Sequence, residues 1–142
     1  LSPGQRDMLY INRINPIALM PSRGLVLYGQ KTRAVVNTAM DRINVARLVN
    51  YLRRNLDIIV KPFVMEPNDK QTRDAVKLTV DRFLSGIVGL RGLEDYAIQV
   101  DESNNTQERV ARKELWCDIA IKPVDAVEFI YVPMRLTQNS DL

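Results

Sequence analysis

Two long segments with apolar side chains at helical spacing constrain the fold of this 142-residue chain most strongly. The first begins near Asn44, a favourable N-cap residue, and ends near Leu56; the second covers about 69–88. In the first segment the apolar side chains fall within about 100° of arc, which is typical of one buried helix face. The apolar stripes are Val45, Leu48, Val49, Leu52 and Leu56 in the first helix, and Val76, Val80, Phe83, Leu84 and Ile87 in the second.

Strand patterns surround these two helices. Short β-prone runs predict strands at residues 25–28, 58–65, 96–100, 115–121 and 127–134, the first two of them buried, with Pro62 suggesting an edge or a bulge in the second. The last two are expected to form an antiparallel hairpin because only a short link separates them. A short helix is expected at the start, where Ser2, Pro3 and Gln5 match a capped helix N-terminus. The order of elements predicts an α+β fold: a mixed β-sheet with two main helices packed on one face and a C-terminal β-hairpin.

The composition predicts one globular domain over residues 1–142. Apolar residues make up 46% of the chain and charged residues 26%, which argues against disorder. No apolar run approaches the roughly 20 residues that span a bilayer, so we expect no membrane partner. The chain starts at Leu1 rather than Met, and we therefore expect it to be a piece of a longer protein.

The sequence has no histidine and a single cysteine, Cys117. The lack of histidine removes Ser-His and Cys-His catalysis, most zinc chemistry and the usual proton shuttle near neutral pH. A single cysteine excludes an internal disulfide and a cysteine-based zinc site. An enzyme would need carboxylates, lysine, tyrosine or an added metal, and these residues form no catalytic pattern. The sequence therefore predicts no catalytic residue, no cofactor, no metal and no enzymatic activity.

The stretch GLVLYGQKT, residues 24–32, comes close to the phosphate-binding loop G-x-x-x-x-G-K-[ST]. Gln30 stands where that loop needs its lysine, and Lys31 comes one residue late. The residues between the glycines are apolar and β-prone, whereas the loop needs a tight turn. We interpret the stretch as a strand between two turns and expect no nucleotide binding.

The stretch DESNNT, residues 101–106, begins like a calcium loop but does not continue as one. A calcium loop needs glycine at position 6 and glutamate at position 12, and this chain has Thr106 and Arg112 there. The stretch is better interpreted as a polar turn.

The charges are unevenly distributed along the chain. Residues 1–62 hold ten Lys and Arg against three Asp and Glu, whereas residues 63–142 hold ten against fourteen. A basic and an acidic half favour association with further copies or with an acidic partner, although a solvated surface is an equally simple reading. A nucleic-acid-binding module using the basic half is the alternative function, but the dense clustering that phosphate contacts need is missing.

Four phrases of the sequence, in this order, resemble one known family. They are INPIALMPSRGLVLYGQKT (14–32), DRINVARLVNYL (41–52), FVMEPND (63–69) and VDESNNT with WCDIAIKPVDAVEFIYV (100–132). Together they resemble the C-terminal domain of contractile bacteriophage tail sheath proteins, a family that R-type pyocin and type VI secretion sheaths share. Pro16, Gly24 and Tyr28 fit the family pattern, and the resemblance extends from about residue 1 to about residue 136.

The resemblance implies a structural role rather than catalysis. It implies a subunit domain that polymerises as stacked rings around an inner tube and contracts to drive that tube through the target cell envelope. The implied partners are other sheath subunits, the inner tail tube protein, and the baseplate and tail terminator proteins, with no direct contact to nucleic acid. The implied location is the virion tail, with assembly in the host cytoplasm. The chain would be the inner, tube-facing domain, with the outer sheath domains absent from it.

Two surfaces are candidates for these contacts. The first is the exposed face of the helix at 44–56, with Arg47, Asn50 and Arg54, which we expect either to face the tube or to be simply solvated. The second helix, with Lys70, Lys77 and Asp81 outward, is the rival tube-facing element. The second candidate surface is the expected strand edge at 127–134. The resemblance implies that strands from neighbouring subunits complete this edge. Its candidate residues are Val127, Glu128, Phe129, Ile130, Tyr131 and Val132.

Overall fold

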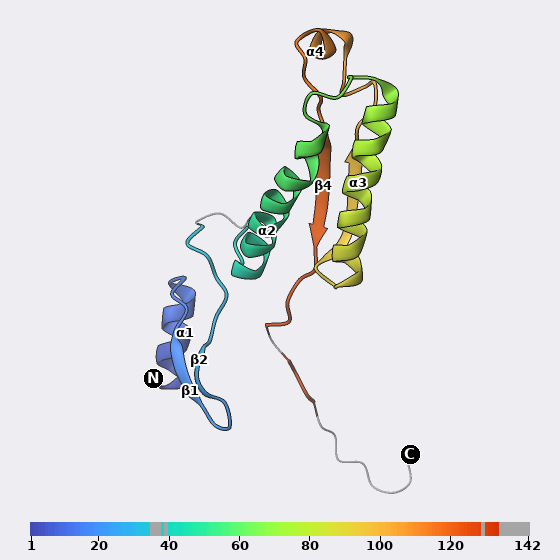
Figure 1. Cartoon of the computed structure of the whole chain (residues 1–142). Coiled ribbons are helices and arrows are strands. Elements are labelled where there is room, and N and C mark those ends of the chain that lie inside the picture. The colour runs from blue at the N-terminus through green and yellow to red at the C-terminus, as the bar shows by residue number, and fades with distance from the viewer. Residues whose placement is uncertain (35–37, 39, 129, 134–142) are drawn as a thin grey trace, which may run out of the picture.

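The computed structural model describes residues 1–34, 38, 40–128 and 130–133 (Figure 1). Its elements, in chain order, are α1 (Pro3–Ile11), β1 (Ile17–Met20), β2 (Gly24–Leu27), α2 (Ile43–Val60), the 3₁₀ helix η1 (Lys61–Phe63), α3 (Lys70–Gly89), β3 (Leu93–Gln99), α4 (Gln107–Ala111) and β4 (Asp118–Pro123). Helix α1 and the β1–β2 pair form an N-terminal unit beside a main body made by α2, α3, β3 and β4 (Figure 1).

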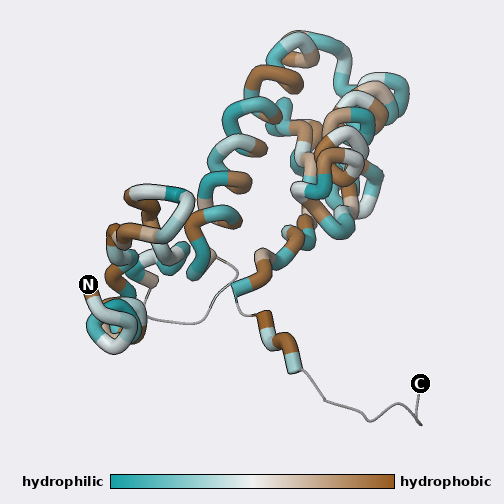
Figure 2. The backbone as a smooth tube through the Cα atoms, turned by 90° about the horizontal axis from the view of Figure 1, so that it is seen from below, coloured by the Kyte–Doolittle hydropathy of each residue, from teal (hydrophilic) through white to brown (hydrophobic). Residues whose placement is uncertain are grey.

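The core of the main body lies between the two long helices and the β3–β4 sheet. Helix α3 begins where the Asp69 carboxylate accepts a hydrogen bond from the Thr72 backbone N–H. One face of α3 supplies most of the buried core, and Leu52 of α2 and Leu93 of β3 complete it. Polar and apolar residues alternate along each turn of the long helices, as expected for amphipathic helices (Figure 2). The buried side chains of this core are Leu52, Val76, Val80, Leu84, Ile87 and Leu93.

The predicted α+β class is confirmed, and so is the packing of both main helices on one sheet face. Apolar residues of the strands and of the segment leading into β4 line the helix side. The opposite face of the sheet is exposed and carries small or polar residues such as Ala97 and Lys122. Every second residue from Leu115 to Ile121 packs against the core: Leu115, Cys117, Ile119 and Ile121.

The strand pairing differs in detail from the expected mixed sheet. Among the described residues there are two separate two-stranded sheets, β1–β2 and β3–β4, and both are antiparallel. The C-terminal strand pair is β3–β4, in which Tyr96 lies opposite Ile121. The described residues of 127–134 are not in a strand. No strand among the described residues pairs with this segment, so its described backbone groups take part in no ladder.

The strand predicted at 58–65 is wrong. Helix α2 continues to Val60, and η1 follows with Pro62 in its first turn. Ile59 and Val60 stand three and four residues after Leu56 and continue the α2 stripe, whereas Ile58 is exposed; Val60 packs on the core, as Leu56 does. A short apolar run has no periodicity of its own, so strand and helix could not be told apart there.

The strand predicted at 25–28 exists as β2, but it is not buried. It pairs with β1, so that Ile17 lies opposite Leu27, and Leu19 opposite Leu25. All four side chains are exposed, Leu25 by 76% and Leu19 by 75%, whereas Ala18 in between is buried. One face of the hairpin is therefore an uncovered apolar surface, which we call the hairpin face.

Truncation of Leu84 to alanine tests the core. Leu84 is fully buried, so removing most of its side chain leaves a cavity, and the free energy of unfolding should fall by about 2–5 kcal/mol. The matched control is Leu78→Ala on the same helix, where the side chain is 60% exposed. Urea denaturation should show the control within about 0.5 kcal/mol of wild type; equal losses in both variants would contradict the assigned core.

Candidate functional site

The predicted tube-facing residues share the exposed side of α2. Arg47, Asn50 and Arg54 are all exposed, while Val45 and Leu52 face the core. Neither arginine forms a salt bridge with any described residue. The structure thus brings them together on one basic surface. The rival residues Lys70, Lys77 and Asp81 are also exposed on α3.

The predicted strand-edge residues lie in the segment that follows β4 and leaves the main body (Figure 1). Ile130 is 81% exposed, Tyr131 86% and Val132 75%, and Val127 is exposed as well. Phe129 lies outside the described residues. We call residues 124–133 the C-terminal segment; Val127, Ile130, Tyr131 and Val132 in it are apolar and exposed, Asp125 is charged and exposed, and Glu128 is half-buried.

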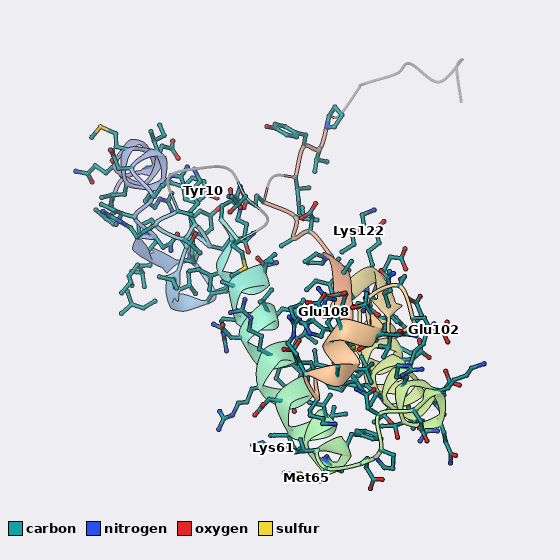
Figure 3. All side chains as sticks on the ribbon, turned by 90° about the horizontal axis from the view of Figure 1, so that it is seen from above. Tyr10, Lys61, Met65, Glu102, Glu108 and Lys122 are labelled. Atoms are coloured by element: carbon teal, nitrogen blue, oxygen red, sulfur yellow. The ribbon has the colours of Figure 1, made fainter. Side chains whose placement is uncertain are left out.

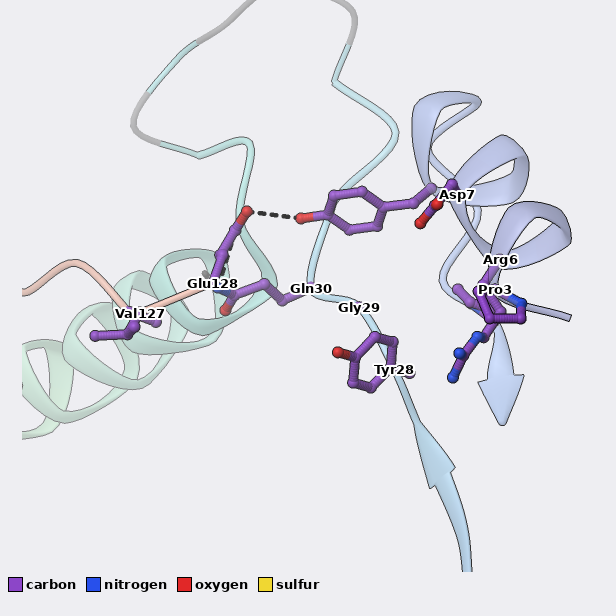
Figure 4. Close-up of a pocket in the computed structure, with 11 residues that line it drawn as sticks. Pro3, Arg6, Asp7, Tyr28, Gly29, Gln30, Val127 and Glu128 are labelled. Atoms are coloured by element: carbon purple, nitrogen blue, oxygen red, sulfur yellow. Dashed lines mark hydrogen bonds between the residues drawn. The ribbon is translucent and has the colours of Figure 1, made fainter. Parts of the chain in front are cut away.

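Glu128 connects the C-terminal segment by hydrogen bonds to three parts of the chain that are far away in the sequence. Its carboxylate accepts a hydrogen bond from the Tyr10 hydroxyl of α1 at 2.8 Å and from the Gln30 side-chain amide at 3.1 Å. Arg42, the residue before α2, donates to both carboxylate oxygens through its guanidinium and also pairs with Asp41. We call Glu128 with Tyr10, Gln30 and Arg42 the Glu128 clasp. Figure 4 shows the Tyr10 contact.

These contacts favour the ionised form of Glu128. Partial burial works against the charge, but hydrogen bonds from Tyr10, Arg42 and Gln30 outweigh it and lower the pKa of the carboxyl. Burial, followed by the bond to Glu128, raises the pKa of the Tyr10 hydroxyl. Since the folded pKa of Glu128 lies below its unfolded value, its stabilising contribution is complete above the unfolded pKa. It is lost as the pH falls through the folded pKa.

The stretch GQKT, which follows β2, supports the clasp. The Asn15 side chain bonds both backbone groups of Lys31, donating to its carbonyl at 2.8 Å and accepting from its N–H at 3.0 Å. A Cβ on Gly29 would lie 2.6 Å from the Asn15 side-chain oxygen, so a larger residue there would displace the Asn15 side chain from its hydrogen bonds to Lys31. The Lys31 ammonium lies 4.0 Å from the centre of the Tyr10 ring and donates to the Tyr10 carbonyl at 3.3 Å. Lys31 therefore helps to hold the Tyr10 side chain in position.

A groove of about 470 Å³ lies beside the clasp, between α1, the end of β2 and the C-terminal segment (Figure 4). Tyr28, Pro16 and Val127 are among the residues that line it. At the other end of α2, Lys61 and Met65 lie away from Tyr10 (Figure 3). The clasp is thus local to the join between the N-terminal unit and the main body.

The DESNNT turn is held by amide side chains. Asn104 and Asn105 are buried; Asn105 accepts from the Trp116 N–H at 2.7 Å and donates to its carbonyl at 2.9 Å. Arg109 lies 4.0 Å from the centre of the Trp116 ring. These contacts satisfy buried backbone groups, so the turn has a structural role.

The described part of the chain argues against a metal site, a reactive thiol and a membrane-spanning helix. No group of three His, Cys, Asp or Glu there is placed to hold a metal ion. Burial raises the pKa of the Cys117 thiol, which keeps the thiol protonated. Among the described residues, no helix combines the length and the apolar character needed to cross a membrane.

Sequence reasoning found the apolar residues of the C-terminal segment but missed the clasp. Glu128 was named only as part of a strand edge. Tyr10, Gln30 and Arg42 were not singled out as site residues, because hydrogen bonds over such sequence separations leave no local pattern.

Comparison with known proteins defines the class. Residues 35–137 match the family model of the phage tail sheath C-terminal domain, and the chain belongs to this family. It is 38% identical over 130 residues to the tail sheath protein of Vibrio phage KVP40, and 36% identical over 126 residues to that of Enterobacteria phage T4. These alignments cover 92% and 89% of this chain. The chain spans about a fifth of the length of these relatives, 19% of each.

Solved structures share the fold. The anti-feeding prophage baseplate structure superposes with a TM-score of 0.87 at 23% identity, covering 97% of this chain and 40% of that one. The contracted sheath complex of an extracellular contractile injection system, PVC, gives a TM-score of 0.86 at 21% identity, covering 99% and 41%. Since these identities are low, the likeness shows the fold alone.

Nucleotide binding can be tested directly at Lys31. Its ammonium is engaged by Tyr10, and residues 24–27 form a paired strand rather than a phosphate-wrapping turn. Calorimetry with ATP or GTP and Mg²⁺ should therefore give no binding heat. Saturable binding that disappears in Lys31→Ala would contradict this interpretation.

Proposed function

We propose that the chain is the inner, tube-facing domain of a contractile tail sheath protein. In this proposal the sheath protein polymerises around an inner tube and contracts to drive the tube through the target cell envelope. The role is structural and not enzymatic. The partners are other sheath subunits, the inner tail tube, and the baseplate and tail terminator proteins. The protein resides in the virion tail after assembly in the host cytoplasm, and the outer sheath domains account for the remaining length of the relatives.

One observation carries the proposal: the molecule has two uncovered apolar surfaces, one on the β1–β2 hairpin and one on a β-prone segment that is not in a strand. The hairpin face exposes Leu19 and Leu25, and the C-terminal segment exposes Ile130 and Tyr131. Large exposed apolar surfaces mark interaction sites. A two-stranded hairpin is only marginally stable alone, and added strands with a covered face stabilise it.

Strand addition between copies would cover both surfaces at once. The C-terminal segment leaves the main body with its backbone unpaired by any strand among the described residues. Added to the hairpin of a neighbour, the segment would gain ladder hydrogen bonds and would bury apolar side chains on both chains. The same exchange, repeated from copy to copy, builds a polymer.

Proline at Ile130 tests this pairing. Proline removes the N–H that a ladder needs, so Ile130→Pro in the full-length protein should leave soluble, folded subunits that fail to polymerise. Deletion of the residues after Met134 should act in the same direction. Negative-stain microscopy should show cylinders for wild type and for the control Ile130→Ala, which keeps the N–H. Normal cylinders from both the proline and the deletion variants would contradict strand exchange.

The basic surface of α2 is the proposed contact with the tube. Arg47, Asn50 and Arg54 are exposed, and the arginines have no described partner in the chain. Exposed ion pairs are individually worth only about 0.2–1 kcal/mol. Such pairs are easily broken and remade, which suits a contact that must move along a symmetric tube.

Charge reversal tests the tube contact. Arg47→Glu with Arg54→Glu should abolish tube-templated assembly at low salt while folding remains intact, because both cations become repulsive toward an acidic tube. The matched control is Lys70→Glu with Lys77→Glu on α3, the rival surface. Sedimentation with purified tubes at low and moderate salt gives the readout. If the α2 variant coats tubes as well as wild type at both salts, α2 faces elsewhere.

A further inference from the structure

Among the described residues of the C-terminal segment, Glu128 alone makes side-chain hydrogen bonds to other parts of the chain; next to β4, the Val124 backbone N–H also donates to the Gly92 carbonyl at 3.3 Å. Ala126 and Val127 before Glu128 are exposed, and so are the described residues after Phe129. Glu128 itself is 18% exposed and accepts hydrogen bonds from Tyr10, Gln30 and Arg42. The partners come from α1, the segment after β2 and the residue before α2, so the attachment reaches the N-terminal unit and the start of α2.

We propose that Glu128 is a positioning residue: the Glu128 clasp fixes the direction in which the C-terminal segment leaves the subunit. The role in assembly rests on the proposed function, since a segment must reach a neighbour for its direction to matter. A segment held in one direction loses less conformational freedom when it pairs, and pre-organisation of this kind strengthens and speeds association.

The chemistry of the clasp is specific to a carboxylate. Two anionic oxygens accept from the Tyr10 hydroxyl, the Gln30 amide and the Arg42 guanidinium, and charge-assisted bonds of this kind are the strong ones. A glutamine at 128 keeps the size but has one acceptor oxygen, and its NH₂ group would face donors. Asp41 also bonds to Arg42 and holds the guanidinium in place, while Lys31 holds the Tyr10 ring.

Distance measurements on free subunits test the clasp itself. Spin labels at Leu78→Cys and Ile130→Cys, two exposed positions, in a full-length protein whose native cysteines, Cys117 included, are replaced, report the direction of the segment through pulsed electron paramagnetic resonance. We expect one narrow distance distribution in the parent protein. Glu128→Gln should broaden it clearly, whereas Asp125→Asn, the same charge change at an exposed residue of the same segment, should not. An equally narrow distribution in Glu128→Gln would overturn the proposal.

Assembly of unlabelled full-length protein gives the second readout. At equal concentration, Glu128→Gln should form cylinders about tenfold more slowly than Asp125→Asn. Its thermal unfolding midpoint should be lower, because the clasp stabilises the fold, but the variant should be fully folded at the assay temperature. Broadened distances with a normal assembly rate would overturn the positioning role. If wild type forms no cylinders at all but the distances still broaden, the proposed function fails while the clasp stands. Should Glu128→Gln not fold, Tyr10→Phe, which removes one donor and keeps the ring, serves in both measurements.

Discussion

Burial of one face of α3 is the interaction on which the rest of the structure depends. Val80 and Leu84 are fully buried, and α2 and the β3–β4 sheet reach the core by packing against this face. A two-stranded sheet is only marginally stable alone in water, so β3–β4 depends on packing against the helix for its stability. These packing contacts lie within residues 43–123, and they bury the apolar faces of the two long helices. The hairpin face and the C-terminal segment lie outside it and keep their apolar side chains exposed.

A small polar cluster connects these outer parts to the main body. Glu128 receives donors from α1, the end of the hairpin and the start of α2, and Asn15 fixes the backbone that carries Gln30 and Lys31. Hydrogen bonds hold direction better than apolar contacts do, because they depend on angle as well as distance. The molecule therefore combines a buried apolar core with an exposed segment that the Glu128 clasp attaches to the subunit, and the proposed exchange of strands between copies would use both.

Sequence reasoning succeeded where the chemistry repeats locally. The stripes of both long helices follow a period of 3.6, and residues such as Leu52 and Leu84 are buried as predicted. It failed at 58–65, where a short apolar run continues a helix, and at 25–28, where β-prone residues form a strand that is exposed. An apolar sequence indicates that a surface is stabilised by burial. It does not indicate whether that surface is buried by the same chain or by another. The Glu128 clasp was missed because its partners are 86 to 118 residues away.

The central claim is that the C-terminal segment of one subunit completes the β1–β2 hairpin of another. A cryo-EM map of the assembled full-length protein tests it most directly, because the chain can be traced from β4 through Glu128 and onward. The account predicts that residues 130–132 form a strand on the hairpin of a neighbouring copy, covering Leu19 and Leu25. A map in which that segment folds back on its own subunit, or in which the hairpin face remains bare, would contradict it.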